Sequence, residues 1–200
     1  MSPRPRQASD EDILMAAFRA IRRLGPARLT LADVAKDAGV SPAALVQRFG
    51  SKRALLLAVA ADAAGGSQYI FPGIRARHRR PVAALLGLSE CLTLMGTTPE
   101  TIANNLTFFQ IDLKDKEFHR HALAASQGML DGITALVREA IAAGELARCN
   151  AGRLATAIHA TMNGSLLNWV VHRQGPLVAS VRRDIETVLA PYRRKKRRLS

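Results

Sequence analysis

Cysteine, aromatic residues and long apolar runs are all scarce in this chain of 200 residues. Its two cysteines, Cys91 and Cys149, lie far apart and fit no metal-ligand spacing, which argues against a disulfide scaffold and favours free thiols in a reducing compartment. The longest apolar stretch, 54–61, is far too short to span a bilayer. No apolar core follows the basic residues at the N-terminus, so we expect no secretory signal and a cytoplasmic protein.

Signatures of catalysis are missing as well. Gly164 and Ser165 do not belong to a Gly-x-Ser-x-Gly elbow. His119 and His121 are two residues apart, so on a helix they point to different faces, and no third metal ligand follows at a suitable spacing. The sequence also has no glycine loop of the kind that binds phosphate. We therefore expect a non-enzyme without a cofactor or a metal site.

Positive charge, in contrast, is abundant, and the formal net charge is +13. A protein this basic is expected to bind a polyanion, either nucleic acid or an anionic membrane surface. The excess lies in three places: residues 1–64 carry +4, the short segment 75–80 another +4, and the C-terminal run 193–198 carries +6. The remainder is close to neutral, which indicates a polyanion-binding module joined to a body without that role.

Almost every segment has the pattern of an α-helix, and no strand alternation or internal repeat is present. Ser9 with Asp12 and Thr30 with Asp33 are capping-box patterns, each of which predicts a helix N-terminus. The expected helices cover roughly 9–24, 30–38, 41–49, 51–64, 81–96, 99–113, 118–143, 151–172 and 177–192. The fold class is therefore all-α, with an N-terminal three-helix domain followed by a larger helical domain.

Two domains are expected, 1–64 and 65–200. The boundary rests on the run Gly65-Gly66-Ser67 and on a predicted turn at Pro72-Gly73, followed by a basic linker at 75–80. A basic tail at about 193–200 is expected to be disordered.

The second and third helices are separated by Ala38-Gly39-Val40-Ser41, which is typical of a helix-turn-helix motif. Gly39 can adopt the left-handed conformation that the tight turn needs. In this motif the second of the two helices lies in the major groove of DNA, with its N-terminal residues leading. The candidate DNA-binding residues lie on the outward face of that helix or at helix N-termini: Thr30, Ser41, Pro42, Ala43, Ala44, Val46, Gln47, Arg48 and Lys52.

These side chains suit the chemistry of a groove. Gln47 can pair with the edge of an adenine, and Arg48 with guanine or a phosphate. Ala43, Ala44 and Val46 are small or apolar enough to contact thymine methyl groups. The residues at the helix N-termini are placed to bind phosphate.

Two runs resemble the tetracycline-repressor (TetR) family of regulators. They are 29–41, with the sequence LTLADVAKDAGVS, and 49–56, with the sequence FGSKRALL. Members of this family are dimeric transcription factors, in most cases repressors that a small molecule releases from a palindromic operator. The resemblance covers about 10–64, and the Phe-Gly-Ser-Lys run is specific to it. Family members usually have Tyr where this chain has Val46, and often His where it has Gln47. In the family that Tyr typically contacts a phosphate, and our hypothesis is that the basic arm with Arg4 and Arg6 compensates for the loss of this contact.

For the remaining helices, the resemblance implies a ligand pocket and a dimer interface on the last two long helices. One face of 151–172 would carry small side chains that let a partner helix approach, although packing within one monomer explains the same pattern. They are Ala157, Ala160 or Thr161, Gly164 and Asn168. The expected effector is apolar or neutral. The candidate ligand-binding residues are Cys91, Met95, Asn105, Phe109, Met129 and Trp169.

One alternative stays open at this point. A basic architectural or membrane-associating helical protein could use the linker 75–80 and the tail 193–198 without recognising any operator. The two functions differ in one measurable respect, because an architectural protein binds any duplex with comparable affinity.

Overall fold

The computed structural model describes residues 8–194, apart from the side chains at 112 and 113. All regular elements in this part of the chain are helices, and the one pairing of β type is an isolated bridge between Leu146 and Arg193. The all-α prediction is confirmed. The chain forms two compact units, one containing the residues up to Ala64 together with Glu100–Leu123, and the other containing Gly65–Pro99 together with the residues from Ala124 onward.

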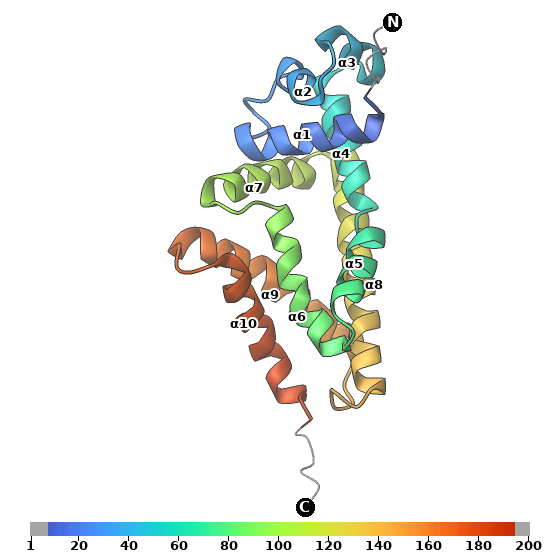
Figure 1. The fold of residues 1–200 in the computed structure, drawn as a ribbon, viewed down its shortest axis with the longest axis vertical. Coiled ribbons are helices and arrows are strands. Elements are labelled where there is room, and N and C mark those ends of the chain that lie inside the picture. Colours follow the sequence, from blue (N-terminus) through green and yellow to red (C-terminus); the bar gives the residue numbers. More distant parts are fainter. Residues whose placement is uncertain (1–7, 195–200) are drawn as a thin grey trace, which may run out of the picture. The chain divides into compact units, whose positions relative to one another are not determined.

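The first unit contains the helices α1 (Asp10–Leu24), α2 (Leu31–Ala38), α3 (Pro42–Phe49) and α4 (Lys52–Ala64), which follow one another along the chain (Figure 1). It also contains α7 (Pro99–Lys114) from its second residue onward and the first part of α8 (Lys116–Ala142). Helix α1 packs against α2 and α4, and α2 packs against α3.

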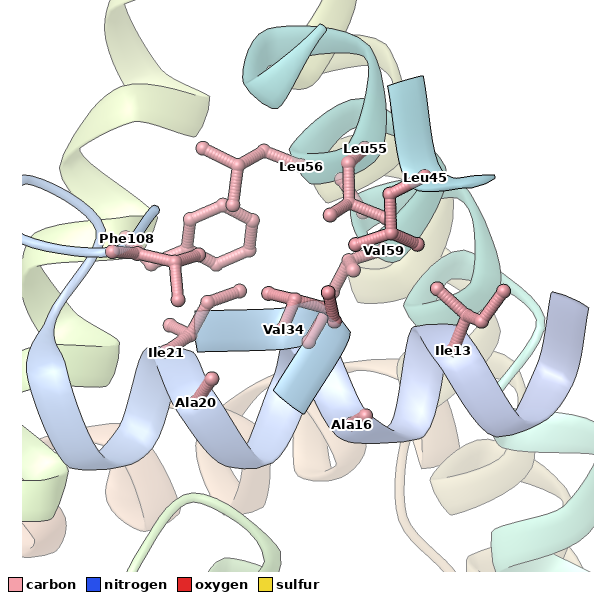
Figure 2. Close-up of a cluster of buried hydrophobic side chains, with 14 of the residues drawn as sticks. Ile13, Ala16, Ala20, Ile21, Val34, Leu45, Leu55, Leu56, Val59 and Phe108 are labelled. Carbon is pink, nitrogen blue, oxygen red and sulfur yellow. The ribbon is translucent and has the colours of Figure 1, made fainter. Parts of the chain in front are cut away.

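An apolar cluster holds this unit together. Figure 2 shows Ile13 and Ile21 of α1 beside Val34 of α2 and the leucines of α4, with Leu45 reaching the same cluster from α3. Phe108 of α7 joins the cluster and packs edge-on against Phe118 of α8, with ring centroids 6.2 Å apart. Burial of these side chains fixes the crossing of α2 and α3, which is what positions an exposed helix face on this unit.

The second unit contains α5 (Ser67–Arg77), α6 (Pro81–Cys91), the 3-10 turn η1 (Leu92–Leu94), most of α8, α9 (Ala151–His172), α10 (Leu177–Leu189) and the turn η2 (Ala190–Tyr192). Helix α10 packs against both α9 and α6, and α5 packs against α6 (Figure 1). The buried side chains on α10 recur every four residues, at Leu177, Val181, Ile185 and Leu189, which is the spacing of one helix face.

The predicted turn at Pro72-Gly73 is wrong, because α5 continues through Pro72 as far as Arg77. Of the predicted linker 75–80, only residues 78–80 connect α5 to α6, since 75–77 belong to α5. Tertiary packing explains the difference. Two glycines on α8 lie one turn apart, and a β-carbon on Gly128 would strike Ser67 while one on Gly132 would strike the ring of Phe71. Close packing of α5 on this part of α8 outweighs the hydrogen bond that the proline ring removes from the helix.

The two compact units do not follow the chain in the simple order of the predicted domains. The division at Ala64 coincides with the predicted boundary, but Glu100–Leu123 packs with the N-terminal helices. Arg193 and Arg194, at the start of the expected tail, have defined backbone pairings, and the remaining tail residues lie outside the described residues.

Candidate nucleic-acid interface

The turn between α2 and α3 has the geometry of a helix-turn-helix motif. Gly39 has φ 68° and ψ 31°, in the left-handed region, and the amide of Val40 donates to the carbonyl of Ala35 at 2.9 Å. Ala35 is only 1% exposed, so its small side chain leaves room for α3 to cross closely. The apolar underside of α3 is Leu45, which is fully buried, with Val40 and Phe49 packed beside it.

The opposite face of α3 is exposed and carries the predicted reading residues. Pro42, Ala43, Val46, Gln47 and Arg48 are all exposed, and Ala44 is half-buried. Val46, the atypical residue of this face, is 49% exposed. This face can offer one amide and one guanidinium to base edges and apolar contacts to thymine methyl groups.

The N-termini of α2 and α3 differ in their charge. Thr30 caps α2 in a reciprocal box, in which its hydroxyl donates to the Asp33 carboxylate at 2.6 Å, and these hydrogen bonds lower the pKa of Asp33. That carboxylate sits at the positive end of α2 and opposes a phosphate there. The first turn of α3 has no acidic residue, and Ser41 caps it by accepting from the amide of Ala44 at 3.1 Å. Of the two, α3 offers the better anion-binding N-terminus.

Two of the predicted DNA-binding cations are engaged within the protein. The guanidinium of Arg48 donates to the Ala8 carbonyl at 2.6 Å and lies 3.4 Å from the carboxylate of Asp10. The ammonium of Lys52 donates to the carbonyl of Ala27 at 3.1 Å, in the loop before α2. Neither contact is apparent from the sequence, because the partners are backbone carbonyls in segments far along the chain.

Polar residues at the junction of α7 and α8 bind an arginine whose contact with them could not be predicted from the sequence. Arg53, at the start of α4, lies 2.7 Å from both the Asp115 and the Glu117 carboxylates, and its guanidinium stands 5.6 Å from the centre of the Phe118 ring. The hydrogen bond from Arg53 lowers the pKa of Asp115, which also accepts from the backbone amide of Glu117. The helix that follows α3 is thereby joined to the start of α8 within the same unit.

A second link within this unit comes from α7. The side-chain amide of Asn104 donates to the carbonyl of Arg22 at 2.9 Å, at the end of α1. Gly25 has φ 75°, and a β-carbon there would stand 2.8 Å from the Asn104 amide oxygen. Glycine is therefore required at the end of α1 on both conformational and steric grounds.

The predicted ligand-binding residues are divided between the two units. Asn105, which is 3% exposed, and Phe109, which is 46% exposed, belong to the first unit, and the other four belong to the second. Burial raises the pKa of the Cys91 thiol to about 11. The indole of Trp169 donates to the carbonyl of Gly175 at 2.8 Å. Neither unit by itself gathers all six residues, and their role as a pocket stays a prediction.

The second unit does contain an open cleft of about 180 Å³ between α9 and α10. Its wall is polar, and Ser165 donates to the Asp184 carboxylate there at 2.6 Å. Of the predicted ligand-binding residues only Trp169 lines this cleft, together with Ser165, Asn168, His172, Gln174, Ser180, Arg183 and Asp184.

Two further properties concern the described part of the chain. Within residues 8–194, no single helix is both long and apolar enough to cross a membrane, and two pairs of consecutive helices reach that length only when each pair is taken together. Among the same residues, no three His, Cys, Asp or Glu side chains come together as a metal-binding group.

An αL glycine turn, a buried underside of α3 and an exposed outer face define a helix-turn-helix DNA-binding protein. Residues 13–59 match the family model of bacterial regulatory proteins of the tetR family, and residues 106–185 match the model of the tetracyclin repressor-like C-terminal domain. The chain belongs to the TetR family of DNA-binding transcriptional regulators. No curated protein matches it by sequence.

Solved structures of this family have the same fold. A TetR transcription regulator from Haloarcula marismortui is 18% identical, with a TM-score of 0.75 over 92% of this chain and 98% of that chain. SmeT, the repressor of the Stenotrophomonas maltophilia multidrug efflux pump SmeDEF, is 23% identical, with a TM-score of 0.65 over 95% and 93%. FadR from Bacillus subtilis, solved with stearoyl-CoA, is 19% identical, with a TM-score of 0.67 over 91% and 98%.

Proposed function

We propose that this protein is a cytoplasmic, dimeric repressor that a small-molecule effector releases from a palindromic operator. The observation that carries the proposal is the exposed outer face of α3, which combines Val46, Gln47 and Arg48 beside an N-terminus without acidic residues. Effector binding would change the separation of the two recognition helices in the dimer. Successive major grooves require a separation of about 34–36 Å, so such a change weakens operator binding.

Selection of bound DNA from a random duplex pool tests this function directly. We expect one short inverted repeat to be enriched, with half-sites about one helical turn apart. A matched pair of variants then assigns the reading face: Gln47→Ala should relax the preference at one base position, whereas Gln68→Ala, an exposed glutamine on α5, should leave the selected sequence unchanged. A pool with no enriched sequence would overturn the proposal.

The effector is proposed to be apolar or neutral. Support comes from one neighbour in fold, which is the structure of SmeT with triclosan. In this chain the predicted contacts of the second unit include two methionines and Trp169, whose side chains suit an apolar molecule. Thermal-shift screening of apolar compounds, followed by operator release, is the matching experiment.

The dimer is proposed to form through α9 and α10. On α9, Ala157, Ala160 and Asn168 are exposed, and a β-carbon on Gly164 would have open space around it. Leu167 and Val171 on the same helix are 50% and 76% exposed, so this face is apolar as well as closely approachable. A second copy of the chain would cover it, as a palindromic operator requires.

The architectural alternative makes a different prediction for the same selection. It expects comparable affinity for every duplex and a strong dependence on salt alone. No catalytic role is proposed for the protein.

A further inference from the structure

The basic residues at 77–80 and at 193–194, far apart in the chain, come together at one end of the second unit. The backbone amide of Arg194 donates to the carbonyl of Glu145 at 3.3 Å, and the side chain of Arg80 donates to the Glu145 carboxylate at 3.0 Å. Glu145 therefore lies between the segment that ends α5 and the segment that follows η2. We call the arginines of these two segments, together with Arg148 shortly after Glu145, the arginine end: Arg77, Arg79, Arg80, Arg148, Arg193 and Arg194.

Glu145 organises this end from a largely buried position. Its side chain is only 13% exposed, and its second carboxylate oxygen accepts from the amide of Val82 at 3.0 Å in the first turn of α6. The neighbouring backbone is paired as well, since Ala147 donates to the carbonyl of Tyr192 at 2.8 Å. The Glu145 carboxylate and a short backbone pairing between two segments of the chain thus hold the arginine end in a defined arrangement.

The charge of this end is only partly balanced. Arg77 lies 3.4 Å from Glu90, and Arg193 lies 3.4 Å from Glu186, so the described acidic partners are these two glutamates and Glu145. Arg79, Arg148 and Arg194 are exposed. The sequence then continues directly into Lys195, Lys196, Arg197 and Arg198.

We propose that the arginine end is a second DNA-binding surface, which contacts the sugar–phosphate backbone of duplex DNA without reading its sequence. Guanidinium groups bind phosphate oxygens through paired N–H donors, and every charged donor identified here in the described residues is an arginine. A membrane surface fits less well, because stable interfacial binding also requires apolar side chains. None of the large exposed apolar side chains in the described residues lies at 77–80, 145–148 or 190–194. The inference rests on the proposed DNA-binding function and assigns it an additional surface.

The test compares two triple variants of the full-length protein with equal loss of charge. Arg79→Gln, Arg148→Gln and Arg194→Gln neutralise arginines of this end that form no described ion pair, so Glu145 keeps Arg80. The control is Arg19→Gln, Arg120→Gln and Arg138→Gln, three exposed arginines on α1 and α8 that lie outside α3 and outside the proposed dimer helices α9 and α10. Affinity for a random-sequence 30-base-pair duplex is measured by fluorescence anisotropy between about 50 and 300 mM salt.

Each lost phosphate contact lowers the slope of log affinity against log salt by about 0.9, so we expect the test variant to lose about 2 to 3 from its slope. The control variant is expected to keep the wild-type slope within about 0.5. For both variants, operator affinity at the highest salt is expected to change less than threefold from the wild-type value. Equal slopes for all three proteins, with operator binding intact, overturn this inference and leave the proposed function standing. If the wild type binds the operator no more tightly than a random duplex, the proposed function itself is overturned. If the arginine end binds vesicles of phosphatidylserine and phosphatidylcholine more tightly than duplex DNA, the proposed DNA-binding role of the arginine end is overturned in favour of a membrane partner.

Discussion

The guanidinium of Arg48, on the recognition helix, donates a 2.6 Å hydrogen bond to the carbonyl of Ala8, which lies two residues before α1 begins. Asp10, in the first turn of α1, adds a carboxylate 3.4 Å away. The Arg48 side chain therefore has two alternative roles: it contacts DNA, or it holds the start of α1 beside α3.

Variants of this pair separate the two tasks. If Arg48 turns to a guanine or a phosphate in the complex, Arg48→Gln should lower operator affinity by about tenfold to a hundredfold, the effect of one good contact. Asp10→Asn should then preserve or raise the affinity, because it releases a competing carboxylate. Binding is measured by anisotropy with each variant's melting temperature as a control for folding. Equal losses for both variants would contradict base reading and assign Arg48 to positioning α1.

The left-handed turn at Gly39 makes a prediction about stability. Gly39 has φ 68° and no atom within 4 Å of a β-carbon built on it, so Gly39→Ala adds strain without a clash. A left-handed conformation costs an alanine about 1–2 kcal/mol, and urea denaturation should show a loss of that size. Gly73→Ala is the matched control, because Gly73 lies inside α5 with equally open space, where alanine is favoured over glycine by up to about 1 kcal/mol. A stable Gly39→Ala variant would show that the turn can relax.

Much of the motif could be predicted from the sequence because its determinants are local. Thr30 and Asp33 are three residues apart, and the box that they form depends on no other part of the fold. The same holds for Ser41 before Pro42 and for the glycine of the turn. Each helix N-terminus of this kind is encoded within one turn of chain, and the structure has it where the sequence predicts it.

Contacts between distant segments could not be predicted in this way. Arg48 and Ala8 are 40 residues apart, and Arg53 and Asp115 are 62 apart, so no periodicity relates them. The helix through Pro72 follows from Phe71 meeting Gly132, a tertiary contact that outweighs the local preference of proline for a helix end. The sequence feature that indicates this contact is the pair of glycines at 128 and 132, since glycines one turn apart on a helix permit another helix to pack closely.

The cluster around Arg53 predicts a pH dependence. The hydrogen bond from Arg53 lowers the pKa of Asp115 below its usual value of 3.8. The stabilisation is therefore complete above the pKa of the unfolded chain and is lost as the pH falls through the lower pKa of the folded state. Between about pH 5 and pH 2, the melting temperature of the wild type should fall more steeply than that of Arg53→Gln. Arg19→Gln, on the exposed face of α1, should follow the wild type, and parallel curves for Arg53→Gln and wild type would contradict the assignment.

Burial of Cys91 predicts an unreactive thiol. Its pKa is raised from 9.0 to about 11, so at pH 8 its thiolate fraction is roughly a hundredfold smaller than that of an ordinary thiol. In a Cys149→Ser variant, alkylation by iodoacetamide should be slower by about that factor than in the same variant unfolded in urea. The folded rate should keep rising about tenfold per pH unit to pH 9.5, where the unfolded rate levels off. A rate that levels off at the same pH in both states would show that Cys91 is not shielded.

The exposed apolar face of α9 predicts the oligomeric state. Leu167 and Val171 are 50% and 76% exposed, and a dimer would bury both. Leu167→Glu with Val171→Glu places two like charges at that contact in each copy, so sedimentation should show monomers where the wild type shows dimers. Operator affinity should fall by about a hundredfold or more, because the two half-sites are no longer bound by one linked pair. Leu123→Glu is the control, since Leu123 is 61% exposed on α8 outside this face. A double variant that stays dimeric places the interface elsewhere, whereas a monomeric double variant with unchanged operator affinity separates DNA recognition from dimer formation.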